Sequence, residues 1–398
     1  FEVQLQLVAF YMPRLLVPHA RCPAAGSIRQ ALRRAVKVVC IEYKIDGDIP
    51  FVGVDCESLR AEFEERKRSF YPLVKEGRPR LRLGAMLKSC SRLFDEPCSG
   101  CDKKLTSKAR SAWAAHVAQE VTCEVRSPRK WANDPIELLK ARVRELVGDS
   151  WAERKGKGRV YIPDQQGCLE NERLSGGTFG VGLDEFSSCH NRVRVGVAKT
   201  KGKARVVTMQ SARTKEVLGP IHNSLYDHIS SFGWCVRGDV TKSDFETVMG
   251  DIRDREVFIS GDYKSATDNI YLPAVEAIVD VLCESKHLTT VERETLRESF
   301  TDIKWVSLSG KEYPIRRGSM MGNLVSFPIL CLLNKACFDI ACDYAYKHLP
   351  RGNRVRVGRF NGDDCVFCGD RDFFALWQEV VSCFGLVVNT EKTGLSRR

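Results

Sequence analysis

The chain has 398 residues, of which 43% are hydrophobic and 28% are charged, the composition of an ordinary globular protein. Its formal net charge of +11 favours an anionic partner, most often nucleic acid, with a basic metabolic enzyme as the alternative. The most apolar run, residues 324–333, is too short to cross a bilayer, which argues against a membrane-spanning protein. A chain of this length can form two or three subdomains.

The 17 cysteines are scattered, and many lie inside apolar segments, which favours free thiols in a reducing compartment over a disulfide framework. Residues 1–8 lack the basic start of a signal peptide. Because the chain begins with Phe and not with Met, we expect it to be part of a longer product.

Residues 1–130 are the least informative part of the chain, with helical patterns at residues 32–40 and 58–70. They also contain a cysteine cluster with a C-x7-C-x2-C spacing, followed downstream by further potential ligands: Cys90, Cys98 and Cys101, then His116 and Cys123. A structural zinc site needs four well-placed ligands, and only one short pair has the usual spacing. Free thiols in a loop are therefore favoured over zinc.

A helix is predicted over residues 134–147, and a loop-rich region with Gly176 and Gly177 follows Arg173. Two adjacent glycines suit either the close approach of an extended partner or a plain turn.

The sharpest charge feature is residues 191–215, which contain eight basic residues and no acidic one. The basic residues are Arg192, Arg194, Lys199, Lys201, Lys203, Arg205, Arg213 and Lys215. Two strand-like runs bracket a glycine-containing turn here. A purely solvated face usually mixes both signs of charge, so the segment predicts phosphate binding.

Residues 256–262 predict an apolar strand that ends in Asp262, and Asp268 follows six residues later. An amphipathic helix is predicted over residues 272–285. A carboxylate at the end of a buried strand has rigid support and an open side, as a metal ligand requires.

A basic, glycine-rich loop at residues 316–323 leads into a helix that is apolar nearly all round, residues 324–341. Ser326 and Asn334 are polar groups on this helix. Because buried polar groups need partners, these two side chains either form local bonds or face a ligand.

Residues 354–367 form a β-hairpin pattern whose turn carries Asp363 and Asp364. Adjacent carboxylates repel each other, and either solvent or a divalent cation offsets the repulsion. A helix over residues 372–383, a strand over residues 386–388 and Lys392 follow.

If the strands of Asp262 and Asp363 are antiparallel neighbours, their carboxylates meet at one sheet end. They then suit two Mg²⁺ ions roughly 3.5–4 Å apart, the arrangement used in phosphoryl transfer. The basic segment 192–215 is the candidate for holding a triphosphate, and Lys392 is the candidate for protonating the departing pyrophosphate.

These residues resemble ordered motifs of viral RNA-dependent RNA polymerases, over residues 160–398. The motifs are Asp262-x5-Asp268 for A, Gly318-Ser-Met-Met-Gly322-x3-Ser326 for B, Gly362-Asp-Asp364 for C, Lys392 for D and the basic run from Lys199 to Arg205 for F. The phrases Gly-Asp-Tyr-Lys-Ser-Ala-Thr-Asp-Asn-Ile and Asn-Gly-Asp-Asp are similar to those of the ourmia-like (botourmiavirus) and narnavirus group.

The resemblance implies residue roles. Asp262 and Asp363 would be metal ligands with Asp364 in support. Asp268, helped by Ser326, would read the ribose 2′-hydroxyl. The NTP phosphates would be held by basic residues, and Gly322 would give a mobile loop room beside the template base. These basic residues are Lys203 and Arg205, with Lys199 and Lys201 less central.

Two departures from the family pattern stand out. The family's motif B places an Asn one helical turn after the Ser position, where this chain has Leu330. Asn334 lies one turn further on and is the substrate-binding candidate in its place. The chain also ends just after motif D, so the primer grip and most of the thumb are absent from the sequence.

The implied fold is α+β, a right-hand polymerase with fingers and palm, whose palm has an RRM-like antiparallel sheet flanked by helices. The predicted parts are an N-terminal region of unclear role (1–130), fingers (131–255), palm with motif A (256–286), a fingers insertion (287–315) and palm with motifs B, C and D (316–398).

The implied activity is template-directed RNA synthesis from NTPs on a positive-strand viral genome, with two Mg²⁺ ions that Mn²⁺ can replace. Partners would be a single-stranded RNA template, nascent RNA and NTPs. The host cytoplasm is the expected location, and the mitochondrion is the alternative.

Two rival functions are a reverse transcriptase and a non-catalytic RNA-binding protein. A reverse transcriptase usually has a bulky residue at the position of Asp268, which excludes the ribose hydroxyl, so Asp268 argues against this rival.

Overall fold

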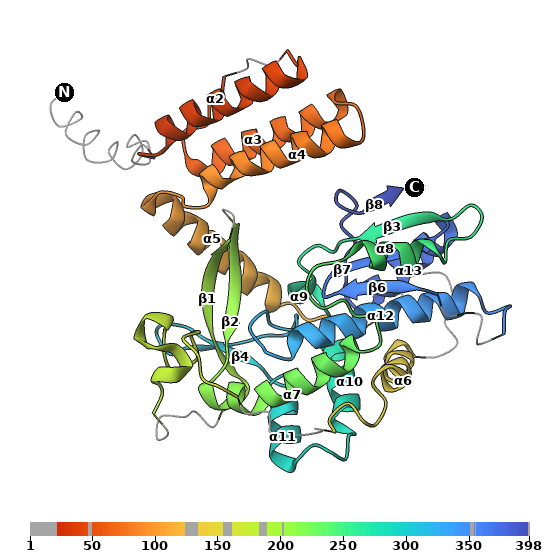
Figure 1. Ribbon diagram of the computed structural model, residues 1–398. Coiled ribbons are helices and arrows are strands. Elements are labelled where there is room, and N and C mark those ends of the chain that lie inside the picture. The colour runs from red at the N-terminus through yellow and green to blue at the C-terminus, as the bar shows by residue number, and fades with distance from the viewer. Residues whose placement is uncertain are drawn as a thin grey trace, which may run out of the picture. The chain divides into compact units, whose positions relative to one another are not determined.

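The structure is a computed structural model that describes residues 22–46, 50–123, 134–153, 161–182, 189–200, 203–350, 354 and 356–396 (Figure 1). The chain divides into two compact units. Unit 1 comprises Phe1–Ala112 and Val197–Val206, and unit 2 comprises Trp113–Gly196 and Val207–Arg398. The division thus comes before residue 130, where the sequence suggested a boundary, while the assignment of fingers and palm stays a prediction.

Unit 1 is helical. Its helices are α2 (Ala25–Tyr43), α3 (Cys56–Phe70), α4 (Arg78–Cys90) and α5 (Ser99–Val117), the last of which continues into unit 2. A reciprocal capping box between Asp55 and Ser58 starts α3. Leu32, Leu59 and Leu83 are fully buried in a common core. The helices predicted at residues 32–40 and 58–70 are confirmed, and both are longer than predicted.

One sheet has the strand order β2-β1-β4-β5. Its strands are β1 (Arg192–Thr200), β2 (Lys203–Met209), β4 (Lys304–Val306) and β5 (Glu312–Pro314), and β1 runs parallel to β4. The two strands predicted around the basic turn are therefore confirmed. The basic segment does not continue as one surface, however, because Lys215 lies in helix α7 (Ala212–Ser230), is buried, and donates to the carbonyl of Gly167 at 2.8 Å.

The second sheet, in unit 2, is antiparallel throughout and has the order β6-β7-β3-β8. Its strands are β3 (Val257–Gly261), β6 (Gly358–Asn361), β7 (Asp364–Gly369) and β8 (Gly394–Ser396). The strand predicted at residues 386–388 is wrong. Val388 forms only an isolated bridge with Tyr263, and β8 occupies the sheet edge instead.

Helices cover both faces of this sheet. On one face lie α12 (Ser326–Ala345) and α13 (Arg371–Cys383), where the Phe338 ring of α12 contacts Phe360, Phe367 and Phe373. On the other face, Phe245 of α8 (Lys242–Met249) packs against Phe258 with ring centroids 5.7 Å apart. The unit is thus an α+β structure with a four-stranded sheet between helices (Figure 1).

The helix predicted to be buried all round is confirmed as α12, which packs against α13, α6 and α10. The remaining helices are α6 (Pro135–Val147), α9 (Ala266–Asn269), α10 (Leu272–Cys283) and α11 (Thr290–Glu298). Within the described ranges, no helix has both the length and the apolar character needed to cross a bilayer.

Candidate active site

Three carboxylates gather at one end of the second sheet. Gly261, the last residue of β3, pairs with Cys365 of β7. Asp262 directly follows β3, and Asp364 directly precedes Cys365, so the antiparallel register places them opposite each other. Asp363 lies in the turn between β6 and β7. The neighbouring strands expected from the sequence are therefore present.

The turn that carries Asp363 is held by three residues of helix α12. Gly362 has φ +63°, and an added Cβ there would lie 2.7 Å from the Phe327 ring, so the position requires glycine. The Gly362 amide donates to the Cys331 sulfur at 3.2 Å, and the Asn334 amide group donates to the Gly362 carbonyl at 3.1 Å. These bonds fix the turn to helix α12.

Asn334 connects this turn to the strand of Asp262. Its oxygen accepts a hydrogen bond from the Tyr263 hydroxyl at 2.8 Å, while its nitrogen bonds Gly362. The side chain is fully buried. Both ends of the amide are engaged inside the protein, which agrees with the alternative of local bonds and indicates a positioning role between the two carboxylate-bearing segments. The substrate contact of Asn334 stays a prediction.

Asp262 has two side-chain partners from the segment before β8. The Asn389 amide donates to Asp262 Oδ2 at 2.9 Å, and Lys392 Nζ lies 3.3 Å from the same oxygen. The Asn389 backbone amide also donates to the Asp262 carbonyl at 2.8 Å. The sequence singled out Lys392 but not Asn389, since nothing in the pattern shows that this loop folds back onto β3.

The Asp364 carboxylate lies close to two other negative charges. Desolvation and the negative charges of Asp363 and Asp262 raise the pKa of Asp364, while Lys392 lowers it. The Asp364 side chain is exposed to solvent, which limits the effect of desolvation. The neighbouring carboxylates are therefore the main reason that its pKa is raised. Several carboxylate oxygens with one nearby lysine form a donor set that suits a hard divalent cation.

We expect Asp364→Asn to stabilise the metal-free protein at neutral pH, raising the unfolding temperature by roughly 1–3 °C. The folded-state pKa of Asp364 lies above the unfolded one, so its ionised form opposes folding. The gain should be present at pH 7 and vanish below about pH 4, where the carboxyl is protonated in both states. Thermal unfolding in EDTA at both pH values tests this. A variant equally or less stable than wild type at pH 7 would contradict the charge repulsion.

Asp268 is held by residues from the end of α5. Trp113 Nε1 donates to Asp268 Oδ1 at 3.2 Å, and His116 Nε2 lies 3.1 Å from the Asp268 backbone oxygen. Burial raises the pKa of the Asp268 carboxyl, while the Trp113 hydrogen bond lowers it. Neither aromatic residue was predicted to support the site, because the first 130 residues carry no pattern that ties them to Asp268.

The predicted motif B residues lie at the start of α12. Ser326 is buried, and its hydroxyl lies 2.7 Å from both the backbone carbonyl and the hydroxyl of Ser319. Gly322 lies against β2: its amide donates to Thr208 Oγ1 at 3.2 Å, and an added Cβ would lie 1.5 Å from the Thr208 carbonyl oxygen. The glycine is therefore required by close backbone packing, and its role beside a template base stays a prediction.

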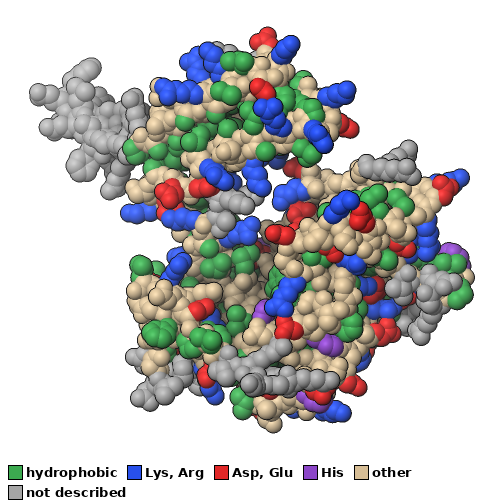
Figure 2. Space-filling view, in the orientation of Figure 1, with side chains coloured by type: hydrophobic (Ala, Val, Ile, Leu, Met, Phe, Trp, Pro, Cys, Tyr) green, Lys and Arg blue, Asp and Glu red, His purple; other side chains and the backbone are tan. Residues whose placement is uncertain are grey.

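The four basic residues assigned to the NTP phosphates, Lys199, Lys201, Lys203 and Arg205, belong to unit 1, whereas the carboxylates belong to unit 2. Lys199 Nζ lies 2.5 Å from Asp102 Oδ2, and Arg205 is exposed on β2. Lys201 lies outside the described residues, as does the side chain of Lys203. Figure 2 shows Lys and Arg side chains interspersed with Asp and Glu over the visible surface.

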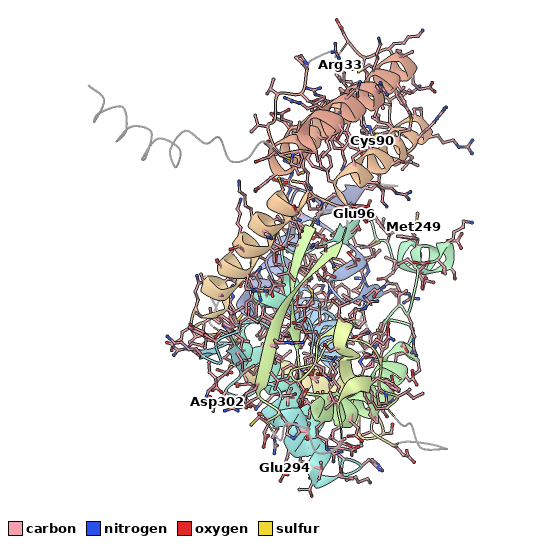
Figure 3. The ribbon with its side chains drawn as sticks, turned by 90° about the vertical axis from the view of Figure 1, so that its left-hand side faces the viewer. Arg33, Cys90, Glu96, Met249, Glu294 and Asp302 are labelled. Atoms are coloured by element: carbon pink, nitrogen blue, oxygen red, sulfur yellow. The ribbon has the colours of Figure 1, made fainter. Side chains whose placement is uncertain are left out.

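The cysteine prediction needs a correction. Cys98 and Cys101 gather with Cys22 and Cys56, and the four sulfur atoms all lie within 4.8 Å of one another. Cys90, at the end of α4 (Figure 3), is not in this group. The two potential ligands further downstream, His116 and Cys123, belong to unit 2. The sequence spacing could not reveal Cys22 and Cys56, which come from the starts of two other helices.

Comparison with known proteins supplies the family context. No family model matches the chain. Over 163 residues, 40% of the chain, it is 32% identical to the "RNA-directed RNA polymerase" of Saccharomyces 20S RNA narnavirus. Over 156 residues, 35% of the chain, it is 28% identical to the "RNA-dependent RNA polymerase" of Ourmia melon virus. The chain is similar to viral RNA-directed RNA polymerases. The resemblance expected from the motifs is thereby confirmed, and it includes both a narnavirus and an ourmiavirus.

The matched regions span 20% and 18% of the length of these two viral polymerases.

Proposed function

We propose that this protein is an RNA-directed RNA polymerase that replicates a positive-strand RNA virus genome. The proposal rests on one observation. Asp262 lies next to the turn of Asp363 and Asp364 at one end of an antiparallel sheet. The similarity to two viral polymerases supports the same reaction class. We further propose that unit 2 includes the palm and that the β1–β2 hairpin belongs to the fingers.

Asp262 and Asp363 would hold two Mg²⁺ ions, or Mn²⁺ in their place, with Asp364 in support. When bound, the ions would activate the primer hydroxyl and offset the negative charge that develops on the phosphates. The Asn389 amide orients the Asp262 carboxylate through Oδ2. Asn334, bonded to both Tyr263 and Gly362, holds the two carboxylate-bearing segments in register.

The remaining predicted residues would act on the nucleotide. Asp268, oriented by Trp113, is our candidate for the group that reads the ribose 2′-hydroxyl. Lys203 and Arg205, with Lys199 and Lys201, are candidates for holding the triphosphate. Lys199 is paired with Asp102, so it would have to exchange that partner for a phosphate.

Template-directed incorporation of labelled NTPs and dNTPs by the full-length natural protein tests the proposal. We expect NTPs to be incorporated faster than dNTPs on a single-stranded RNA template. Faster incorporation of dNTPs would favour a reverse transcriptase. RNA binding without incorporation of either would favour a non-catalytic binding protein.

The proposed partners are the RNA template, the nascent strand and NTPs. The proposed location is the host cytoplasm, with the mitochondrion as the alternative.

We expect Lys392→Leu to slow nucleotide addition by about 10²-fold, because a general acid contributes roughly that much to proton transfer. Lys392 Nζ lies 3.3 Å from Asp262 Oδ2, which supports a role beside the proposed metal site. Lys392→His should recover part of the rate and move its pH maximum downward, because imidazole titrates at lower pH than an ammonium group.

Single-turnover incorporation measured against pH separates these outcomes. Lys242→Leu is a suitable control, because the Lys242 side chain is 90% exposed. Equal rates in Lys392→Leu and wild type, or an unchanged pH profile in Lys392→His, would exclude the general-acid role.

A further inference from the structure

Four cysteines from separate parts of unit 1 meet at one point. Cys56 is the first residue of α3, Cys22 lies just before α2, and Cys98 and Cys101 flank the start of α5. The Cys22 sulfur lies 3.5 Å from both the Cys56 and the Cys98 sulfur. Cys56 is buried and the other three are half-buried.

These distances fit ligands of one ion better than disulfides. A disulfide joins its sulfurs at about 2.05 Å. Four thiolates around one zinc ion, each about 2.3 Å from the metal, lie roughly 3.8 Å from one another. The observed separations of 3.5 Å, with all four sulfurs within 4.8 Å, match the second arrangement. Among the described residues, no other group of cysteine or histidine side chains converges in this way.

The surrounding helices favour negative charge at this point. The N-termini of α2, α3 and α5 all begin beside the sulfurs, and these helices have 19, 15 and 19 residues. A helix N-terminus carries a partial positive charge, which stabilises thiolates. Three helix N-termini at one cluster therefore offset part of the negative charge of the four thiolates.

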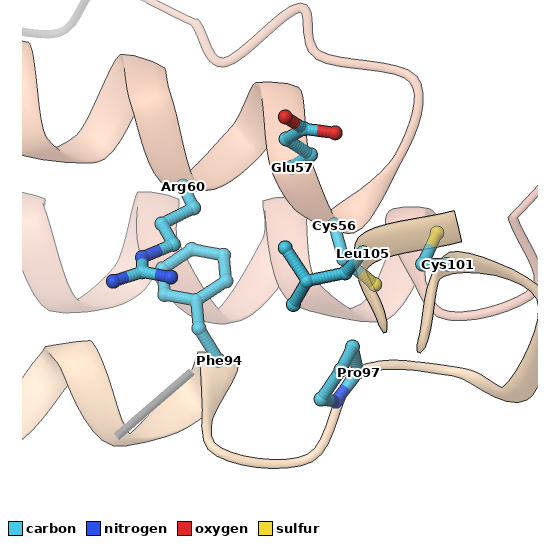
Figure 4. Close-up of a pocket in the computed structure, with 7 residues that line it drawn as sticks. All are labelled: Cys56, Glu57, Arg60, Phe94, Pro97, Cys101 and Leu105. Atoms are coloured by element: carbon cyan, nitrogen blue, oxygen red, sulfur yellow. The ribbon is translucent and has the colours of Figure 1, made fainter. Parts of the chain in front are cut away.

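The cluster also has a route to the surface. A small pocket with a volume of about 40 Å³ reaches Cys56 and Cys101 (Figure 4). Its walls include the apolar side chains of Phe94, Pro97 and Leu105. An ion can enter here. The pocket is also lined by Glu57, but its carboxylate is paired with Lys108 at 2.6 Å.

We infer that Cys22, Cys56, Cys98 and Cys101 bind one zinc ion that holds the N-terminal ends of α2, α3 and α5 together. Four cysteine sulfurs in tetrahedral arrangement are typical of structural zinc sites, and such a site has no open position for a substrate. Zinc would therefore stabilise unit 1 and take no part in chemistry. The inference is independent of the proposed polymerase activity.

Metal content tests the inference. The full-length protein is purified in zinc-containing buffer without chelators and analysed by inductively coupled plasma mass spectrometry. We expect one zinc ion per chain in wild type and at least a roughly five-fold lower content in Cys98→Ser. Cys90→Ser is the matched control, because Cys90 is in the same unit but outside the cluster, and it should keep the zinc. Equal zinc content in wild type and Cys98→Ser would overturn the inference.

Because Cys98→Ser could fail to fold, a second measurement uses wild type alone. Co²⁺ added to the metal-stripped protein should produce the intense visible absorption of tetrahedral thiolate coordination, and one equivalent of zinc should abolish it. Absence of this absorption would overturn the inference. So would an intact mass lower by four hydrogens under non-reducing conditions, if peptide mapping places both disulfides among Cys22, Cys56, Cys98 and Cys101.

Discussion

RNA synthesis is expected to fall by at least about 10³-fold in Asp262→Asn and in Asp363→Asn. Each substitution keeps the shape of the side chain but removes a negative charge from the proposed metal site. Catalytic metal ions contribute several kcal/mol to transition-state stabilisation, and about 4 kcal/mol corresponds to a 10³-fold change in rate. The measurement is single-nucleotide extension of a primed RNA template in Mg²⁺.

The control for this prediction is Asp254→Asn, because the Asp254 side chain is 99% exposed. It should keep the wild-type rate. RNA affinity, measured by fluorescence anisotropy, should be unchanged in all three variants, which separates loss of chemistry from loss of binding. Wild-type rates in Asp262→Asn or Asp363→Asn would remove these carboxylates from the catalytic centre.

Arg356→Met is expected to lower the free energy of unfolding by about 3–5 kcal/mol, the cost of leaving a buried charge without its partner. The Arg356 side chain is 1% exposed and its guanidinium bonds both oxygens of Glu256, at 2.6 and 2.7 Å. A further bond, of 2.7 Å, joins it to Asp251. These contacts join the segment before β6 to the start of β3.

The ion pair between Arg356 and Glu256 also makes the free energy of unfolding depend on pH. Burial alone would raise the pKa of Glu256, but its hydrogen bonds to Arg356 hold the pKa below its ordinary value. A lowered folded-state pKa stabilises the protein above the unfolded pKa, near pH 4.3, and this stability is lost as pH falls through the folded pKa. The free energy of unfolding should therefore fall less with decreasing pH in Arg356→Met than in wild type.

Urea unfolding followed by circular dichroism provides the test, with Arg213→Met as the control. Arg213 pairs with Glu216 on an exposed helix face, so its loss should cost less than about 1 kcal/mol. The double variant Arg356→Met/Glu256→Met should recover part of the lost stability, because neither charge is then left unpaired. Equal stability of Arg356→Met and wild type would contradict the structural role.

The sequence predicted the parts of the site that depend on local patterns. The strand that ends at Asp262 and the turn of Asp363 and Asp364 follow from alternating apolar residues around turn residues, and their antiparallel pairing is observed. The apolar periodicity of α12 also predicted its burial.

Contacts between distant segments were not predictable in the same way. The residues from Arg354 to Val357 alternate like a strand in sequence, yet β6 begins at Gly358, and Arg356 forms a buried ion pair with Glu256. Likewise, Trp113 and Asp268 are 155 residues apart, and no local pattern encodes their hydrogen bond.

The most direct test of the central claim is the number of divalent ions at the carboxylate cluster. Electron paramagnetic resonance can count bound Mn²⁺ in the zinc-loaded protein with primed RNA and a non-hydrolysable NTP. We expect two Mn²⁺ ions per wild-type chain and at most one in Asp363→Asn, with Asp254→Asn unchanged. Equal binding in wild type and Asp363→Asn, or no binding in either, would contradict a two-metal centre at this sheet end.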